Sequence, residues 1–305
     1  MVVQGNFGPL FRGGLRKDFR DSYKSQPEEF SKYLKVGKMD GPEISAALLT
    51  GLTRFLERGD AEPITYEDPV MGPVVTGVDK EFALGFIISR RTVEDDLYGK
   101  ANQSAKWLGR AAQLTKEYRG GGFLDDAFTG ATYVGYDGQP LISTAHTFLN
   151  PTGATTWSNR LAVEVGLSVT GVTAMFDLFQ TMKDHNGDPI VSFPDTLIIG
   201  NNAGDYHRAL QIFGGNLEPF TADNTENAIK KRMPNPKIII SHYKTNLTSY
   251  FMVDSQLSDA HFLMRRDVEF DDTFDFDTDA AKYKGSMRFL IWFVDPRGWV
   301  GASPV

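Results

Sequence analysis

The sequence places a serine, a histidine and an aspartate close together, and these are the side chains of a hydrolytic triad. Ser143 could act as the nucleophile, His146 as its base and Asp137 as the carboxylate that orients the histidine. The surrounding residues contain no G-x-S-x-G pattern, so a turn held by local hydrogen bonds explains the same spacing better. We therefore predict no catalytic residue, and a soluble serine hydrolase using Ser143 and His146 is kept as an alternative hypothesis.

A run of acidic residues in the last part of the chain could bind a hard cation through its carboxylates. The spacing Asp275-x-Asp277-x-Asp279 imitates the start of a calcium-binding loop, but the sixth position is Ala280 and the twelfth is Ser286. We therefore interpret the run as a solvated acidic face rather than a metal site. Its members are Asp267, Glu269, Asp271, Asp272, Asp275, Asp277 and Asp279.

The remaining polar motifs indicate no cofactor. The glycine-rich pieces GGLRK, GGGF and GGN lack the phosphate cradle of a nucleotide-binding loop, and the histidines show no spacing typical of a metal site. We therefore predict no metal, cofactor or nucleotide site. The scattered histidines are His146, His185, His207, His242 and His261.

The chain has 305 residues, a net charge of −7 and no cysteine. The acidic balance argues against a uniformly basic nucleic-acid binder, because phosphate binding needs a surplus of Lys and Arg on some face. It is compatible with a shell that encloses nucleic acid without gripping it. The lack of cysteine fits a reducing compartment. Since we find no signal peptide and no stretch of ~20 apolar residues, we expect a soluble protein made in a cytoplasm.

A long helix is expected over 92–119, and it would span a whole domain and position the neighbouring elements. Its small and apolar residues recur with helical spacing, so they share one face along which another backbone can lie close. Thr92 is the predicted N-cap, acidic residues follow it, and the glycines at 120–122 are expected to break or kink the helix. The residues of the predicted face are Leu97, Ala101, Ala105, Leu108 and Ala112.

Residues 1–42 form a predicted N-terminal arm that is rich in glycine and carries scattered aromatic residues. The arm is either a loosely ordered tail or an extended segment that docks on another subunit. Its cations could touch DNA or a scaffolding protein, or could form salt bridges between subunits or remain solvated. These cations are Arg12, Arg16, Lys17 and Arg20.

Two further elements are expected between the arm and the long helix. A start signal at 40–43, followed by Ile44, Leu48 and Leu52 at helical spacing, predicts a helix that ends near Gly59. Residues 62–89 then read as a long β-hairpin with a proline- and glycine-bearing tip, because 82–88 alternate like a strand. A hairpin of this kind is marginal in isolation, so we expect it to lie on a neighbouring chain.

The rest of the chain predicts a mixture of helices and strands, and the fold class is therefore α+β. Asp137–Gly138 indicates a tight turn. The apolar run at 286–294 predicts a central strand with both faces buried. The other expected elements are helices over 167–183 and 203–213 and strands at 196–199, 237–241, 249–253 and 261–264.

This order of elements resembles the tailed-phage major capsid protein of the Hong Kong 97 fold, and more closely the Mu-type major head subunit family. The resemblance covers nearly the whole chain but its motifs are short. Where the family carries an aromatic residue, this sequence has Ile142. The motifs are the segments RRTVEDD at 90–96, YDGQPLISTAH at 136–146 and DPR at 295–297.

The resemblance implies a shell protein without catalytic residues. It would self-assemble into pentamers and hexamers around double-stranded DNA, with portal, scaffolding and decoration proteins as further partners, in a virion assembled in the host bacterial cytoplasm and without a membrane. In such a shell the acidic run would face the genome or a subunit boundary. A nanocompartment shell similar to encapsulin is an alternative. The implied parts are an N-terminal arm (1–42), a peripheral domain (43–61 and 90–154) with its spine helix (92–119), an extended loop (62–89), an axial domain (155–258) and peripheral return strands (259–305).

Overall fold

The computed structural model is an α+β fold that divides into two compact units. It describes residues 7–89, 92, 99–150, 155–217, 219, 225–275 and 280–304, with side chains from residue 14 onward. The first unit takes its described residues from Met1–Ile44, Gly77–Gly120 and Phe262–Ile291. The second takes them from Ser45–Thr76, Gly121–His261 and Trp292–Val305. Each unit is therefore assembled from segments that are distant in the sequence.

The first unit is built on a four-stranded sheet with the order β1-β10-β11-β4. β4 and β11 are antiparallel, and rings stack across them, Phe82 on Phe289 and Phe86 on Tyr283. Such cross-strand aromatic pairs stabilise a sheet and fix its register. The strands are β1 (Lys35–Lys38), β4 (Lys80–Ser89), β10 (His261–Asp275) and β11 (Ala280–Trp292).

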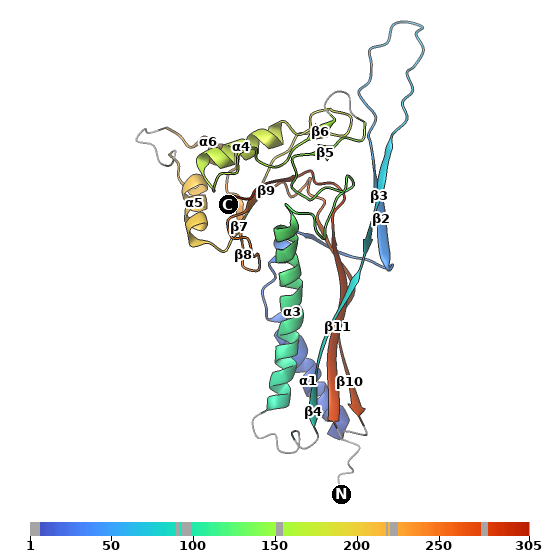
Figure 1. Ribbon diagram of the computed structural model, residues 1–305, viewed down its shortest axis with the longest axis vertical. Helices are drawn as coiled ribbons and strands as arrows, with labels where there is room; N and C mark the ends of the chain where they lie inside the picture. The colour runs from blue at the N-terminus through green and yellow to red at the C-terminus, as the bar shows by residue number, and fades with distance from the viewer. Residues whose placement is uncertain are drawn as a thin grey trace. The chain divides into compact units, whose positions relative to one another are not determined.

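Two helices, α1 (Phe7–Lys24) and α3 (Lys100–Asp126), pack beside this sheet (Figure 1), and a short 3-10 helix, η2 (Phe30–Lys32), follows α1. α1 crosses α3 at Gly109, where a Cβ atom would clash with the carbonyl oxygen of Phe19. Small residues on α3 therefore allow the close approach of the two helices. The hydrophobic cluster between the helices and the sheet consists of Leu15, Phe19, Ile88, Ala101, Ala105, Leu108, Phe270 and Tyr283.

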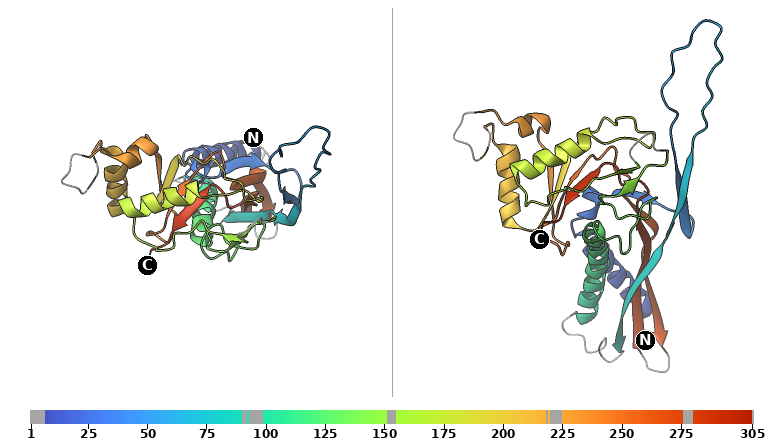
Figure 2. Two further views of the ribbon diagram at one scale, coloured as in Figure 1. Left: turned by 90° about the horizontal axis from the view of Figure 1, so that it is seen from above. Right: turned by 45° about the horizontal axis from the view of Figure 1, so that its top comes forward.

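The second unit contains a four-stranded sheet with the order β12-β9-β7-β8, flanked by three helices (Figures 1 and 2). β7 is parallel to β8 and antiparallel to β9. Ser168, Asn202 and Asn227 cap the helices by accepting hydrogen bonds from backbone N–H groups of the first turn. The elements are β7 (Thr196–Gly200), β8 (Lys237–Ser241), β9 (Tyr250–Val253), β12 (Trp299–Ala302), α4 (Val169–Gln180), α5 (Ala203–Gly214) and α6 (Ala228–Arg232).

Two small two-stranded sheets complete the fold. β2 (Glu43–Leu49) pairs with β3 (Met71–Val78), and β5 (His146–Thr147) pairs with β6 (Thr156–Trp157). The expected helices over 167–183 and 203–213 are confirmed by α4 and α5, and all four expected short strands are confirmed by β7, β8, β9 and the start of β10. Among the described residues, no helix is long and apolar enough to cross a membrane.

Two predictions are wrong, the helix that starts at 40–43 and ends near Gly59 and the hairpin of 62–89. Residues 43–49 are the strand β2, and its partner is β3, so the hairpin begins about twenty residues earlier than the sequence suggested. β4 pairs with β11 across the first unit instead of folding back on β3. Ile44 and Leu48 have helical spacing, but the pairing of β2 with β3 decides the local structure. Local periodicity cannot reveal such a pairing.

The predicted long helix is present, but its bounds are different. α3 begins at Lys100 and continues through the three glycines at 120–122, where a break was expected. Gly120 packs under Phe30, and a Cβ at Gly121 would clash with the Tyr243 backbone, so these glycines serve close packing rather than termination. Thr92 lies outside α3, and the acidic residues of 94–96, together with Leu97, lie outside the described residues.

The N-terminal arm also differs from both predicted alternatives. Residues 7–24 form α1, and Leu15 and Phe19 are buried within the first unit of the same chain. The aromatic residues at 7 and 11 lie outside the described side chains. Residues 7–24 of the arm are therefore neither a loose tail nor an extended segment in this structure.

Candidate functional site

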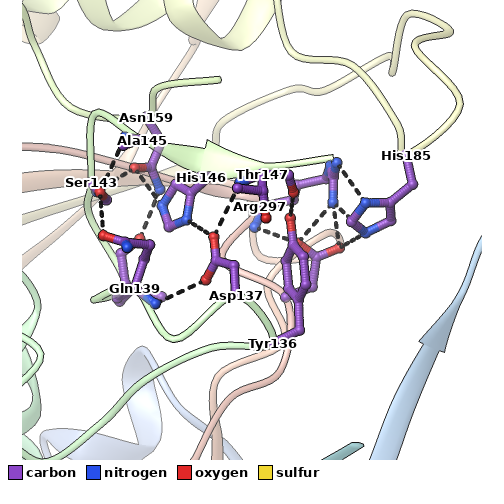
Figure 3. Close-up of polar contacts among 12 residues, drawn as sticks. Tyr136, Asp137, Gln139, Ser143, Ala145, His146, Thr147, Asn159, His185 and Arg297 are labelled. Atoms are coloured by element: carbon purple, nitrogen blue, oxygen red, sulfur yellow. Dashed lines mark hydrogen bonds and ion pairs between the residues drawn. The ribbon is translucent and has the colours of Figure 1, made fainter. Parts of the chain in front are cut away.

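The predicted triad residues lie in the second unit, Asp137 and Ser143 in the segment between α3 and β5 and His146 at the start of β5 (Figure 3). Asp137 sits in a tight turn closed by Gly138, whose φ of 69° confirms the predicted turn. Its carboxylate accepts hydrogen bonds from Gln139 N at 3.0 Å and from His146 Nδ1 at 2.7 Å. Burial raises the pKa of Asp137, but the hydrogen bond and charge of His146 outweigh it and leave this pKa below its usual value.

His146 is fully buried, and its two ring nitrogens both face acceptor oxygens. Nε2 lies 3.2 Å from Asn159 Oδ1, which also accepts from Ser143 N at 2.9 Å. The amide nitrogen of Asn159 donates to Leu141 O at 2.8 Å, so the orientation of this side chain is fixed. The Asn159 oxygen is therefore an acceptor that faces Nε2 of His146.

Ser143 is not activated by this histidine. Its Oγ donates to Gln139 Oε1 at 3.2 Å and accepts from Ala145 N at 3.2 Å, while Nε2 of His146 is directed at Asn159 (Figure 3). A serine nucleophile requires a hydrogen bond to its general base. The geometry is that of a turn held by local hydrogen bonds, as the sequence favoured, and its result is to attach the segment 137–147 to the loop that contains Asn159.

A second buried hydrogen-bond network, centred on Arg297, lies next to the network of Asp137 and His146. The sequence analysis did not predict it. Arg297, 2% exposed, donates to Lys183 O at 2.8 Å, to Asp295 at 3.1 Å and to His185 at 2.8 Å. Burial and the charge of Arg297 lower the pKa of His185 to about 4, so this ring is neutral and accepts the hydrogen bond. Tyr136 packs edge-on against His185. The whole network is a structural clamp among distant segments of the second unit.

Several of the described members of the acidic run lie beside cations. Lys282 lies 2.6 Å from Asp275, and Lys284 lies 3.8 Å from Asp271, across the strands β10 and β11. No group of three or more His, Asp or Glu side chains that could hold a metal occurs within the described residues, which leave out 276–279. These contacts are those of a solvated, ion-paired sheet face.

The most unusual surface of the second unit is the loop that joins β2 to β3. Every residue from 51 to 70 is exposed, although several are large and apolar. The base of the loop is closed by Thr50 N to Val70 O at 2.9 Å and by Asn186 Nδ2 to Gly51 O at 2.8 Å. The exposed apolar residues are Leu52, Phe55, Leu56, Ile64, Tyr66 and Val70.

A space of about 570 Å³ lies between the two arms of this loop, and no side chain of the described residues occupies it. Its lining combines the apolar side chains with Arg54, Arg58 and Glu67. A free monomer gains no stability from apolar side chains that stay in water, because burial of one such side chain is worth roughly 1.5–3 kcal/mol. The loop therefore has the chemistry of a contact surface.

A family described as "Phage capsid protein" matches residues 75–302. No curated protein matches the sequence.

Solved structures with low identity share the fold. The mature capsid of bacteriophage PhiM1 has a TM-score of 0.60 at 9% identity, covering 91% of this chain and 87% of that one. The procapsid of bacteriophage JBD30 has a TM-score of 0.54 at 14% identity, covering 100% and 77%. A virus-like particle from Pyrococcus furiosus has a TM-score of 0.54 at 12% identity, covering 94% and 97%.

Proposed function

This chain belongs to the phage capsid protein family, with the Hong Kong 97-type fold, and we propose that its shell is built from pentamers and hexamers that enclose the double-stranded DNA of a tailed phage or prophage. It is a major capsid protein, and a capsid protein is a component of the virion. Pentamers and hexamers repeat the same modest contacts by symmetry, and such repetition makes closure strong.

The observation that carries this proposal is the exposed loop between β2 and β3. Its apolar side chains are exposed to solvent and pack on none of the described residues outside the loop, and a neighbouring subunit would bury them. We assign the extended loop of the shell to the strands β2 and β3 and residues 50–70, in place of 62–89. The first unit, with α3 as its spine, corresponds in this proposal to the peripheral domain, and residues 155–258 of the second unit to the axial domain.

Finer features of the proposal come from the resemblance of the motifs to the Mu-type major head subunit family. They are assembly in the bacterial cytoplasm and partnership with portal, scaffolding and decoration proteins. The buried clamp around Asp137 and Arg297 has a structural part in this proposal, because its polar groups are satisfied by one another. No residue is assigned to catalysis.

The test is imaging of the purified full-length protein by negative-stain electron microscopy. We expect closed shells, and we expect a variant with residues 53–67 replaced by a short turn to remain a folded subunit that forms none. Ser143→Ala is the matched control, because this change leaves the loop intact and shells should still form. Normal shells from the loop variant would refute the role given to the loop.

A nanocompartment shell is the second candidate, and the likeness to the Pyrococcus furiosus particle over almost its whole length favours keeping it. The two candidates differ in what the shell contains. Packaged double-stranded DNA in particles from the natural source supports the phage head. Particles that hold a protein cargo and no genome support the nanocompartment.

A further inference from the structure

The exposed side of α3 is strongly basic. Lys106 and Arg110 are exposed one helical turn apart, with the 62% exposed Trp107 beside them. Between Lys100 and Gly120 the helix carries one acid, Glu117, and this residue is buried. The charge of the exposed side is therefore positive in a chain whose net charge is −7.

These cations differ from those of the adjoining sheet. On the sheet, Arg266 lies 2.7 Å from Glu81, and Lys282 lies 2.6 Å from Asp275. No carboxylate of the described residues lies within ion-pair distance of Lys106 or Arg110. The positive potential of the sheet is largely cancelled by its own acids, whereas that of α3 remains available to an external anion.

α1 adds further cations where it crosses α3. Ser22 Oγ donates to the carbonyl oxygen of Lys106 at 2.7 Å, so the crossing lies at the same turn of α3 as the basic pair. α1 exposes Asp21 as well, but its exposed cations outnumber its exposed acids. The exposed cations described on α1 are Arg16, Lys17, Arg20 and Lys24.

We propose that this basic helix surface, formed by Lys106, Trp107 and Arg110 of α3 with Arg20 and Lys24 of α1, binds the phosphate backbone of the enclosed nucleic acid. The inference rests on the proposed function, since only a genome-enclosing shell presents this surface to DNA. A duplex carries a charge every ~1.7 Å of its axis, so cations spread over rigid helices neutralise it in any register. The exposed indole adds an aromatic face on which unpaired bases can stack.

An acidic protein segment is the competing ligand, and the observations favour nucleic acid. A peptide needs a shaped apolar pocket to gain specificity from its side chains, whereas a polyanion with regular charges needs only exposed cations and access. The surface offers cations from two helices and one exposed aromatic ring. Binding should be independent of sequence and should weaken steeply with salt.

Trp107 provides a direct readout of this surface. The other tryptophans are Trp157, which is half-buried, and Trp292 and Trp299, which are buried, so contact at α3 should change the emission of Trp107 above all. Random-sequence duplex DNA is titrated into unassembled full-length protein at several salt concentrations. We expect salt-dependent quenching, and we expect Trp107→Phe to remove most of the fluorescence change. Affinity is measured independently from the anisotropy of labelled DNA.

The deciding variant is Lys106→Gln/Arg110→Gln. Each lost phosphate contact should cost about eightfold in affinity at ~0.1 M salt and should reduce the salt slope by about 0.9, so the double variant should lose up to about sixtyfold. The matched control, Lys282→Gln/Lys284→Gln, removes the same charge from cations that are already paired with Asp275 and Asp271, and its affinity should change little.

Equal affinity of the double variant and the natural protein overturns the inference, and so does an equal loss in the control. Polyglutamate that binds as tightly as DNA and displaces it would assign the surface to an acidic protein and overturn the inference as well. Circular dichroism and thermal unfolding confirm that the variants are folded. Shell formation is scored separately by electron microscopy. If the natural protein forms shells and the double variant binds DNA as tightly as the natural protein, only this inference is rejected. If the natural protein forms no shells, the proposed function is rejected.

Discussion

The helix α1 and the loop between β2 and β3 look alike in sequence but differ in structure. Each carries aromatic and aliphatic residues scattered among polar ones. For the N-terminal arm, docking on another subunit was one of two alternatives, and for the predicted hairpin of 62–89 a neighbouring chain was expected. In the structure, Leu15 and Phe19 of α1 are at most 1% exposed, whereas Phe55 and Tyr66 of the loop are almost entirely exposed. Among the described residues, the α1 side chains have packing partners, whereas the apolar side chains of the loop have none.

The difference is explained by what each segment can pack against. α1 packs on α3, where the small residues Ala101, Ala105 and Gly109 leave room for another backbone. The loop extends from a two-stranded sheet, and a hairpin of two strands has too little apolar surface to stabilise its own tip. In the proposed shell, dependence on a neighbour is therefore expected of the loop and not of the α1 residues Leu15 and Phe19.

The largest expected contrast is between Phe19→Ala and Phe55→Ala. Phe19→Ala leaves a cavity beside Phe270 and Leu108, so the free energy of unfolding of the subunit should fall by about 3–5 kcal/mol. Phe55→Ala removes an exposed ring and should change this free energy by less than about 0.5 kcal/mol, while shell formation is impaired. Urea unfolding of unassembled protein measures the first effect and electron microscopy the second.

The comparison would be reversed by the opposite pattern. If Phe55→Ala destabilised the isolated subunit, the loop would have a partner within its own chain. If Phe19→Ala left the subunit unchanged, the burial of α1 would not contribute to its stability. Tyr66→Ala provides a second loop variant, and it should behave like Phe55→Ala because its side chain is also largely exposed.

A smaller effect is expected from Gly109→Ala in α3. The added methyl group would clash with the Phe19 carbonyl oxygen, so α1 must shift, at a cost of about 1–3 kcal/mol in the free energy of unfolding. Gly122→Ala is the matched control, because the same helix has open space at that position. This second change should stabilise the protein by up to about 1 kcal/mol, since alanine favours helix more than glycine does. Equal effects of the two changes in thermal unfolding would mean that α1 does not rest on Gly109.

Local periodicity predicted the elements whose partners lie nearby or whose pattern is strong. The alternation of 82–88 gave β4, and the spacing of Val172, Phe176 and Phe179 gave α4. The same reasoning failed for β2, where helical spacing was overridden by pairing with β3. It also failed for α1, because the glycines of the arm concealed an i, i+4 pattern that ends in Leu15 and Phe19.

The polar clamp of the second unit could be predicted only in part. The short spacing of Asp137, Ser143 and His146 indicated local hydrogen bonds, and the structure contains them. Asn159 and Arg297 complete the network from distant segments, and no spacing in the sequence indicates their positions. Tertiary folding brings these groups together, so residue types alone left the histidine open to a catalytic interpretation.

The smallest expected effect is a pH dependence that belongs to the α1 contact. Lys116 of α3 is buried, and its ammonium group donates to the Tyr23 hydroxyl of α1. Burial lowers the pKa of Lys116 below its usual value, and the nearby Asp267 only partly offsets this effect. The unfolded chain therefore binds this proton more tightly than the folded one. Stability should rise with pH, by at most about 1.4 kcal/mol per unit, between the lowered pKa and the unfolded value near ~10.5.

Lys116→Met should flatten that rise, as measured by urea unfolding at several pH values from neutrality to about 9.5. Above this range Tyr23 opposes the trend, because burial raises its pKa and ionisation then favours the unfolded chain. Lys244, with a pKa lowered to about 7 by burial, adds its own slope, so the difference between variant and natural protein isolates Lys116. Glu67 in the loop does not contribute to this alkaline slope, because a hydrogen bond from Thr53 lowers its pKa below the usual carboxyl value. Lys282→Met, at an exposed position, is the control and should leave the rise of the unfolding free energy with pH unchanged. If Lys116→Met leaves this rise unchanged as well, the buried charge of Lys116 does not contribute to the contact between α1 and α3.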